Sequence, residues 1–489
     1  MHTPIYVGLD IGTTAIKVSA VTRQLETVYE SQYAYDYLTP HKGWTEIEPD
    51  TWVEIVLKGL KELFQHISAN TVAGIGITGQ MHTTVFVDKH GFSVRPAIMW
   101  NDNRTRENIP KIKETLETNP RSVHIAKVVS TGSPLASLLW VKEHEPEHYQ
   151  EISKFLIAKD YVKLKLTGTY STDYCDASTS SLYDLNSDQW SKEVQKLFDL
   201  DSRLYPLIKP ASEVIGTLTP DVCTQLGLET TIPMVSGTGD NVASALASGS
   251  FEHDQPLISL GTSGVVVIPD KHHQLKKCGK NVVAKITSDD HSIITQGTVQ
   301  AGAKVNSWWM ENILHTSEYS EEQKQIDENL LGKNDVLFFP HLNGEKTLFA
   351  NPNLRGAFVG LSLETTREEM YLAVLEGLAF GIRQLFRSMK NEEAPEYFTI
   401  VGGGAKSDLW TKIFANVLGY PIKRVLSSQE AVHGAAILAM IGIDGTFIFP
   451  ETDVQMIEPE FDRVNNYEAR YKQYLELAQM FLLAGGAER

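Results

Sequence analysis

The chain has 489 residues, 42% of them hydrophobic, and carries a formal net charge of −17 at pH 7. That length exceeds what one hydrophobic core usually fills, so we expect two domains, residues 1–246 and residues 247–489. The negative charge argues against a nucleic-acid or anionic-membrane partner, because either would require a basic surface.

The cysteines and the apolar runs indicate the cellular environment. Cys175, Cys223 and Cys278 are widely spaced and odd in number, which favours reduced thiols over a disulfide framework or a zinc site. The first residues lack a signal-peptide pattern, and no apolar run long enough to span a membrane follows. We therefore expect a cytoplasmic protein with no membrane partner.

The N-terminal segment reads as three strands in succession. IYVGLDIGTT and AIKVSAVT are separated by a tight turn at Gly12-Thr13-Thr14, and LETVYESQYAYD follows. Backbone amides and hydroxyls in such a turn can hold phosphate oxygens, and Asp10 can hold Mg²⁺ through water. The alternative is an ordinary hairpin turn, which this motif alone does not exclude.

A helix and another strand are predicted next. Thr51-Trp52-Val53-Glu54 has the capping-box pattern ahead of apolar residues at helical spacing, which predicts a helix of about 18 residues. VAGIGITGQ then reads as a strand. Its Gly74–Gly79 segment matches GxGxxG, but another strand follows where a dinucleotide motif needs a helix, and no Walker sequence occurs. Both kinds of nucleotide site are therefore excluded.

The segment VSGTGDNVASALASGS, residues 235–250, places Asp240 between a glycine turn and a helix that opens at Asn241. Asp is a preferred N-cap, so a capping role is one interpretation. A carboxylate at this position can also act on a substrate.

The second half repeats the plan of the first. PLISLGTSGVVVIP places a turn at Gly261-Thr262-Ser263-Gly264 between two strands. Further on, EYFTIVGGGAKSDLWTKIFANVLG predicts a strand, a glycine turn at 402–404 and a helix, and the glycines would let a flat ring approach the backbone. The chain thus reads as two copies of one design.

These motifs, in this order, resemble those of the FGGY family of carbohydrate kinases over nearly the whole chain. The nucleotide motifs that carry the resemblance are Asp10–Thr14, Gly261–Gly264, Gly402–Ser407 and Glu430–Ala436. Within the family, the branch that acts on keto-pentoses is the most similar, on Gly43–Glu46, Gly79–His82, Trp100–Arg104, Asp173–Ser178, Asn353–Phe358 and the tail residues Tyr467, Arg470, Tyr471 and Tyr474. The resemblance implies an α/β fold of two RNase H-like, actin-like ATPase domains around a central cleft, with sugar bound by the first and ATP by the second.

The resemblance also implies roles for individual residues. Asp240 would be the general base, and Asp10 a catalytic residue that holds Mg²⁺ through water, with Asp240 a second candidate for the metal. The sugar would be bound by Met81, His82, Asp240 and Asn241. ATP would be bound by Thr13, Thr14, Lys17, Gly261, Thr262, Gly403, Gly404 and Ala405.

The expected activity is ATP-dependent phosphorylation of a keto-pentose, D-xylulose, to its 5-phosphate. The alternatives are a kinase for gluconate or another pentose or pentitol and, from another class, an actin-like ATP-driven clamp. Sugar and ATP would be the partners; the oligomeric state is open, a homodimer among the alternatives.

Two sequence features bear on the sugar. Neither Gly79–Asp88 nor Ser236–Asn241 contains Lys or Arg, which favours a neutral sugar over a sugar acid, unless Arg104 or Lys304 folds in from elsewhere. Thr83 and Thr238 depart from the family pattern beside the expected pocket, as does Ser236. They are the first residues to examine if the sugar differs.

Overall fold

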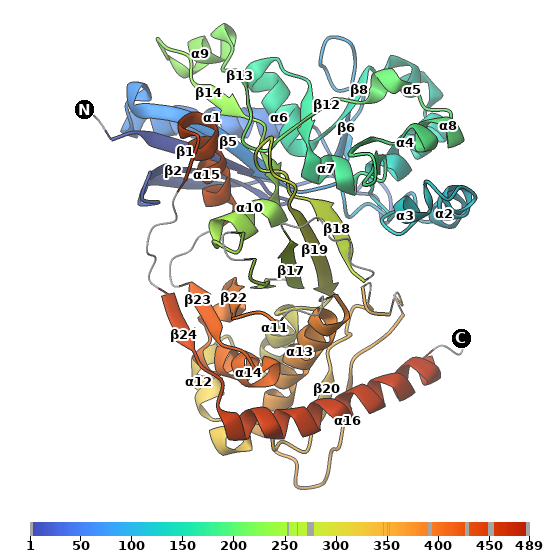
Figure 1. The fold of residues 1–489 in the computed structure, drawn as a ribbon, viewed down its shortest axis with the longest axis vertical. Helices are drawn as coiled ribbons and strands as arrows, with labels where there is room; N and C mark the ends of the chain where they lie inside the picture. Colours follow the sequence, from blue (N-terminus) through green and yellow to red (C-terminus); the bar gives the residue numbers. More distant parts are fainter. Residues whose placement is uncertain are drawn as a thin grey trace.

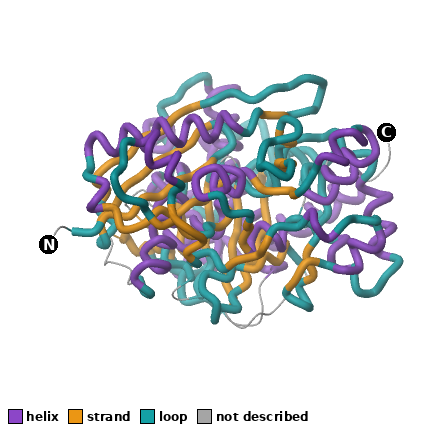
Figure 2. Tube along the Cα trace, turned by 90° about the horizontal axis from the view of Figure 1, so that it is seen from above, coloured by secondary structure: helices purple, strands orange, loops and turns teal. Residues whose placement is uncertain are grey.

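The computed structural model describes residues 3–251, 254–261, 263–270, 278–345, 347–349, 351, 353–389, 394–425, 430–447 and 454–485. Two mixed sheets form the centres of two bodies, with the N-terminus on the upper body and the C-terminus on the lower one (Figure 1). Seen from above, strands run through the middle and helices lie on both sides (Figure 2).

The first sheet has the order β13-β14-β5-β1-β2-β3, with β15 also paired to β5. β1 and β2 are antiparallel across the predicted turn, whereas β1, β5 and β15 run parallel. Its strands are β1 (Ile5–Ile11), β2 (Ala15–Thr22), β3 (Thr27–Ala34), β5 (Val72–Gly79), β13 (Val214–Thr217), β14 (Pro233–Val235) and β15 (Thr238–Gly239).

The second sheet has the order β18-β19-β17-β16-β22-β23-β24. Read from the other end, it repeats the first: β16 and β17 form an antiparallel pair, β16, β22 and β23 run parallel, and an antiparallel edge strand closes the sheet. The predicted internal repeat is therefore present in the strand order. The strands are β16 (Leu257–Leu260), β17 (Gly264–Asp270), β18 (Lys280–Val283), β19 (Ile293–Val299), β22 (Phe398–Val401), β23 (Ile422–Val425) and β24 (Val454–Ile457).

The predicted helix after the third strand is α1 (Asp50–His66). Its start differs from the prediction, because Pro49 is the N-cap and no side chain caps the helix, so the Thr51–Glu54 pattern does not act as a capping box. Asp50 instead accepts a hydrogen bond from the Tyr161 hydroxyl, 2.6 Å away. The first residue of α1, Asp50, thus makes a tertiary contact with α6.

A large insertion between β5 and β14 builds the right-hand part of the upper body (Figure 1). It contributes β6, β7 and β8 to a small sheet of order β4-β7-β6-β8. The remaining strand of that sheet, β4, precedes α1 in the chain. The elements are β4 (Glu46–Ile47), β6 (Thr84–Val87), β7 (Ala97–Ile98), α2 (Ile109–Glu117), α3 (Val123–Ala126), α4 (Pro134–His144), α5 (Pro146–Glu151), β8 (Lys154–Ile157), α6 (Ala158–Thr167), β9 (Ser171–Asp173), α7 (Tyr174–Thr179), β10 (Tyr183–Asp184), β11 (Gln189–Trp190), α8 (Lys192–Leu197), β12 (Leu207–Lys209) and α9 (Pro220–Leu226).

Two helices in corresponding positions of the repeat pack against each other. They are α10 (Asp240–Ala247) and α15 (Ala431–Asp444), and α15 also lies directly on β1 and β5 of the first sheet. A side chain at Gly76 would place its Cβ 1.8 Å from the carbonyl oxygen of Ala435, and one at Gly434 would place its Cβ 2.0 Å from that of Ala243. The GxGxxG match in β5 therefore reflects close helix packing, and β6 follows it after a turn, as predicted.

The lower body is closed by long helices. Tyr467, Tyr471 and Tyr474 are buried on one face of α16, where their rings pack around Phe380 of α13. The tail residues thus have a packing role. The remaining elements are α11 (Lys304–Trp308), α12 (Tyr319–Lys324), β20 (Leu337–Phe339), β21 (Ala357–Val359), α13 (Arg367–Met389), α14 (Asp408–Leu418) and α16 (Phe461–Gly485).

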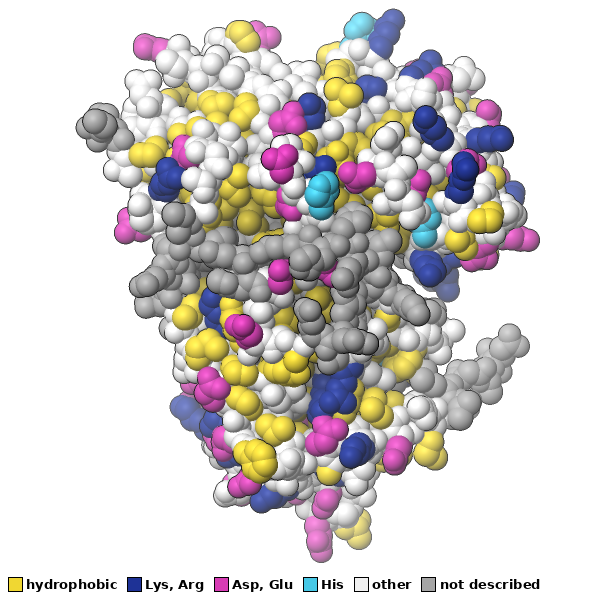
Figure 3. All heavy atoms as spheres, viewed as in Figure 1, with side chains coloured by type: hydrophobic (Ala, Val, Ile, Leu, Met, Phe, Trp, Pro, Cys, Tyr) yellow, Lys and Arg dark blue, Asp and Glu magenta, His cyan; other side chains and the backbone are white. Residues whose placement is uncertain are grey.

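One face of the surface is mixed in charge. On the face shown in Figure 3, Lys and Arg side chains are interspersed with Asp and Glu, and no continuous basic area is seen among the coloured residues. Within the described part of the chain, no helix is both long and apolar enough to cross a membrane.

Candidate active site

The two predicted catalytic carboxylates lie at one edge of the first sheet. Asp10 on β1 is level with Thr78 on β5, and Thr78 is level with Thr238 on β15. Because these strands run parallel, the residues that follow them meet at the same edge, which is where ligands bind in sheets of this kind. Asp240, two residues beyond Thr238, and Asp10 are therefore brought together.

Asp240 is not the helix cap. Gly239 occupies the N-cap position of α10, and Asp240 is the first helical residue, in the turn where the helix dipole favours negative charge. Burial nevertheless raises the pKa of Asp240 to about 6, while the amide of Asn241 opposes the shift. The carboxylate is thus held by the helix start without being used to cap it.

Asp10 lies in a still less favourable place for a negative charge. Burial, followed by the charge of Asp240, raises the pKa of Asp10 to about 7, and Lys17 opposes the shift. Its Oδ1 atom is buried and has no hydrogen-bond partner within the described structure. A divalent cation would satisfy both conditions, so the residues fit Mg²⁺.

The described residues include no cluster of three or more His, Cys, Asp or Glu side chains that could hold a metal. Mg²⁺ usually keeps several waters and takes one or two carboxylates plus phosphate oxygens. The arrangement therefore fits a cation held by Asp10 through water.

The first glycine turn is braced from three sides. The carbonyl of Gly12 accepts hydrogen bonds from the Tyr35 hydroxyl and from Gln80 Nε2, the latter at 3.2 Å. The indole nitrogen of Trp100 donates to the Thr13 hydroxyl over 3.0 Å. Thr14 is exposed at the tip of the turn. Trp100 lies in a segment that carried the family resemblance, but its contact with Thr13 was not predicted.

Lys17 lies at this edge too, directly across β1–β2 from Asp10. Its ammonium forms an ion pair with Glu430, the N-cap residue of α15. Lys17, one of the predicted ATP-binding residues, thus connects the two halves of the chain through this ion pair.

The second glycine turn and the triple glycine lie side by side, because β16 and β22 are parallel neighbours. Gly402 has a φ of +94° and packs directly on Leu260, which fixes the two turns together. Gly261 and Gly403 are exposed, and a Cβ at Gly403 would meet no atom within 4 Å. Ala405, in contrast, is buried, and Thr262 lies outside the described residues.

The predicted sugar-binding residues also converge. The Asn241 amide lies 3.7 Å from the sulfur of Met81, and a Cβ at Gly239 would be 2.7 Å from the Met81 side chain. His82 has a φ of +71° in a tight turn closed by a 2.9 Å hydrogen bond from Thr83 N to Met81 O. Such strain in a non-glycine residue is concentrated at functional sites.

Two side chains from the second half reach these residues. Lys280 Nζ lies 2.9 Å from Nε2 of His82, and Gln296 accepts a 2.9 Å hydrogen bond from Asn241. Lys280 belongs to β18 and lies outside Gly79–Asp88 and Ser236–Asn241, the two segments without Lys or Arg. A cation from elsewhere in the chain therefore lies at the predicted sugar-binding residues, and it is neither Arg104 nor Lys304. Lys280 and His82 are 198 residues apart in the sequence, so their contact could not be predicted from local patterns.

The remaining cations named from the sequence are placed elsewhere. The guanidinium of Arg104 is buried against Asp102 and Glu46, at 2.8 and 2.7 Å, and lies over the ring of Trp44. Lys304 is exposed at the start of α11. The Gly43–Glu46 and Trp100–Arg104 motifs thus brace one another.

Comparison with known proteins identifies the family. Residues 5–247 match the N-terminal domain, and residues 257–443 the C-terminal domain, of the FGGY family of carbohydrate kinases. The chain belongs to this family.

Individual relatives are similar to this chain over nearly its full length. A xylulose kinase from Staphylococcus xylosus is 31% identical, over 97% of this chain and 98% of its own. A solved structure described as a xyloylose kinase from Brucella ovis is 29% identical with a TM-score of 0.88, covering 97% of this chain and 98% of that one. A gluconate kinase structure from Lactobacillus acidophilus has a TM-score of 0.89 at 22% identity, covering 99% of each chain, which supports the fold alone. The protein is thus a carbohydrate kinase with the two-domain α/β fold of this family.

The departures from the family pattern have structural explanations in this kinase. Thr83 is fully buried; its hydroxyl donates to Gln80 and accepts from the Trp100 amide, at 2.9 and 3.1 Å. The Thr238 hydroxyl donates to Asp173 over 2.9 Å. Both side chains are used within the protein, so neither departure by itself changes the groups offered to a sugar.

A buried charged network, made of Lys159, Asp160, Lys163, Asp173 and Asp176, supports the segment that ends at Asp240. Lys163 donates to the carbonyl of Ser236 over 2.9 Å, and Asp173 accepts from Thr238. Burial raises the pKa of Asp176 well above its usual range, so its charged form is disfavoured. Ionisable groups are expensive to bury unless they are paired, so the ion pairs and hydrogen bonds of the network fix the backbone of this segment.

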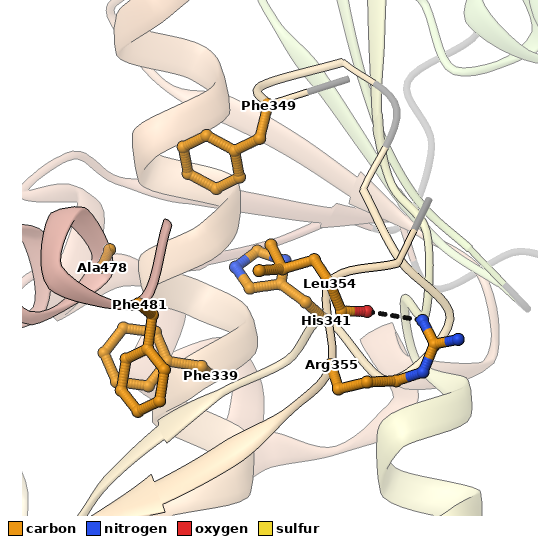
Figure 4. A pocket seen from close by; sticks show the side chains of 7 residues that line it. All are labelled: Phe339, His341, Phe349, Leu354, Arg355, Ala478 and Phe481. Carbon is orange, nitrogen blue, oxygen red and sulfur yellow. Dashed lines mark hydrogen bonds between the residues drawn. The ribbon is translucent and has the colours of Figure 1, made fainter. Parts of the chain in front are cut away.

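A separate cavity lies in the lower body of the kinase. Aromatic and apolar side chains line it, with His341 and Arg355 beside them, and Arg355 donates to the Leu354 carbonyl over 2.8 Å (Figure 4). None of the predicted site residues contributes to its wall. This cavity is therefore distinct from the candidate active site.

Proposed function

We propose that this FGGY kinase transfers the γ-phosphoryl group of ATP to the terminal hydroxyl of D-xylulose and forms D-xylulose 5-phosphate. The observation that carries the proposal is the convergence of Asp240 with Met81, His82 and Asn241 at the edge where Asp10 also lies. Relatives named as xylulose kinases, similar over nearly the full length, support the choice of sugar.

In this proposal Asp240 is the general base. It accepts the proton of the sugar hydroxyl as that oxygen bonds to the γ-phosphorus and the bond to the β-phosphate oxygen of ATP breaks, so that ADP leaves. An ordinary Asp is a weak base toward an alcohol. A pKa of about 6 lies nearer the working pH and makes Asp240 a better proton acceptor that is still ionised at pH 7.

The nucleotide would lie between the glycine turns of the two halves. Residues 1–246 would supply the sugar site and the hydroxyls of Thr13 and Thr14, with Lys17 beside them. Residues 247–489 would supply the exposed glycines Gly261 and Gly403, with Gly404 behind them, although α15 packs on the first sheet. Bound Mg²⁺ would neutralise charge on the phosphoryl oxygens, and Asp10 would hold it through water, with Asp240 nearby.

Gluconate is the second candidate, and Lys280 is the observation in its favour, because an ammonium beside His82 suits a carboxylate. ADP release measured with D-xylulose, gluconate, other pentoses and pentitols, and without sugar tests both. We expect D-xylulose to give the highest kcat/KM. Release of ADP at the same rate without sugar would instead indicate an ATP-driven clamp.

The metal role of Asp10 is tested separately. Asp10→Asn should shift the Mg²⁺ titration of activity to higher concentration, because the amide is a neutral and weaker ligand, and should leave the sugar KM unchanged. A titration identical to that of the wild type would remove Asp10 from this role.

A further inference from the structure

The ribbon of β18 and β19 presents two polar side chains to the predicted sugar-binding residues. Lys280 and Gln296 are directly opposite each other in this antiparallel pair. Lys280 contacts His82, and Gln296 contacts Asn241, each over 2.9 Å. Two neighbouring residues of the second half therefore meet two predicted sugar ligands of the first.

The contact places an ammonium group at a predicted sugar-binding residue. An ammonium group only donates hydrogen bonds, so Lys280 provides a charged donor 2.9 Å from Nε2 of His82.

The negative charges around the site determine what the ammonium group of Lys280 can do for an anionic substrate. Asp10 and Asp240 are both carboxylates, and an anionic acceptor that approaches them is repelled. Lys17, which also lies at this edge, has its ammonium paired with Glu430. An ammonium beside a sugar-binding histidine offsets the repulsion and can donate a charge-assisted hydrogen bond to a carboxylate.

We propose that Lys280 is a specificity-determining residue of the acceptor site, supplied by the second half, and that it allows the kinase to bind polyols bearing a carboxylate, of which gluconate is the probe. The proposal rests on the proposed function, since it concerns the acceptor of the same reaction. A neutral ketose gains only an ordinary hydrogen bond from Lys280, whereas a sugar acid gains one between opposite charges.

The test compares kcat and KM for D-xylulose and gluconate in the wild type, Lys280→Met and Lys280→Arg, with gluconate also measured as a competitive inhibitor of xylulose phosphorylation. Lys280→Met removes the charge and keeps the length, whereas Lys280→Arg keeps the charge. Lys285→Met is the matched control, because Lys285 follows the same strand but lies 3.8 Å from Asp188 and over the ring of Tyr174.

We expect Lys280→Met to weaken gluconate, as kcat/KM or as inhibition constant, by tenfold or more, mainly through KM, and to change xylulose by no more than about threefold. Lys280→Arg should restore most of the gluconate affinity, and Lys285→Met should resemble the wild type. Raising the salt concentration should weaken gluconate in the wild type more than in Lys280→Met.

Equal losses for both sugars in Lys280→Met would make the residue structural and overturn the proposal. So would gluconate that neither reacts with nor inhibits the wild type. If the wild type phosphorylates xylulose and Lys280→Met keeps the same ratio of kcat/KM for xylulose and gluconate, this inference is wrong but the proposed function stands. A wild type without sugar-dependent ADP release overturns the proposed function as well.

Discussion

The two halves share a strand order but differ in where they place negative charge. Gly12 and Gly261 begin corresponding turns, so Asp10 of the first half corresponds to Ser259 of the second. The first half carries carboxylates at the edge of its sheet, whereas the described turns of the second present neutral glycines. A carboxylate in the second turn would repel the phosphates of ATP. The two halves thus share a scaffold but differ in the charge of the residues at these turns.

Buried carboxylates occur in both halves, but in different settings. Glu376 on α13 is 3% exposed, and burial raises its pKa to about 7, as with Asp10. Glu376, however, accepts hydrogen bonds from the Tyr467 hydroxyl at 2.8 Å and from the Gly332 amide at 3.2 Å within the core. A raised pKa therefore does not by itself identify a catalytic group. Asp10 and Asp240 differ from Glu376 in that they lie at the strand ends of the first sheet.

Replacing the base should have the largest effect. Asp240→Asn keeps the shape but cannot accept the proton, so kcat should fall by about a hundredfold or more while sugar and ATP affinities stay within several-fold. Steady-state kinetics and calorimetric binding measure the two parts. Asp221→Asn, at an exposed position in the first turn of α9, is the matched control. A folded Asp240→Asn enzyme with normal turnover would show that the first half does not supply the base.

Glu376 should affect stability and not chemistry. Folded, it holds its proton up to a pKa of about 7, against an ordinary value of 4.5, so its stabilisation is full below pH 4.5 and is lost as the pH rises through 7. Between pH 5.5 and 8 the free energy of unfolding should fall by about 2 kcal/mol through this group.

Glu376→Gln should remove that part of the pH dependence. Urea unfolding of the variant and the wild type at both pH values measures it, with the exposed Glu476→Gln as control. If Glu376→Gln and the wild type lost the same stability over this range, the proton would not be held in the folded core.

The support behind the base should have a smaller effect on turnover. Thr238→Val removes the hydrogen bond to Asp173, so the segment leading to Asp240 becomes less well fixed and kcat should fall about tenfold with little change in KM. Thr238→Ser keeps the hydroxyl and should restore most of the rate. Equal rates in the two variants would assign the hydroxyl no part in positioning the base.

Local patterns in the sequence predicted the strands, both glycine turns and the helix after Gly239, because each depends on residues close together in the chain. The resemblance to the FGGY family, and not the local patterns, assigned Asp10 and Asp240 to one site. The cap interpretation of Asp240 did not hold, because Gly239 adopts the N-cap conformation itself. Lys280 and Trp100 could not be assigned, since their contacts join segments separated by many residues.

The smallest effect concerns the exposed glycine of the second half. Gly403 does not need a positive φ, and a Cβ there meets no atom within 4 Å, so Gly403→Val should fold normally. Its side chain would project where we place the nucleotide and should raise the KM for ATP about fivefold, on the order of 1 kcal/mol, without altering the sugar KM.

Gly404→Ala provides the contrast one residue away. Its Cβ would lie 2.9 Å from Leu260 and 3.0 Å from the ring of Trp410, so this variant should lose thermal stability instead. Melting curves and ATP titrations of both variants separate the two effects. An unchanged ATP KM in a stable Gly403→Val enzyme would mean that the nucleotide does not approach this turn, and the division of labour between the halves would then need another explanation.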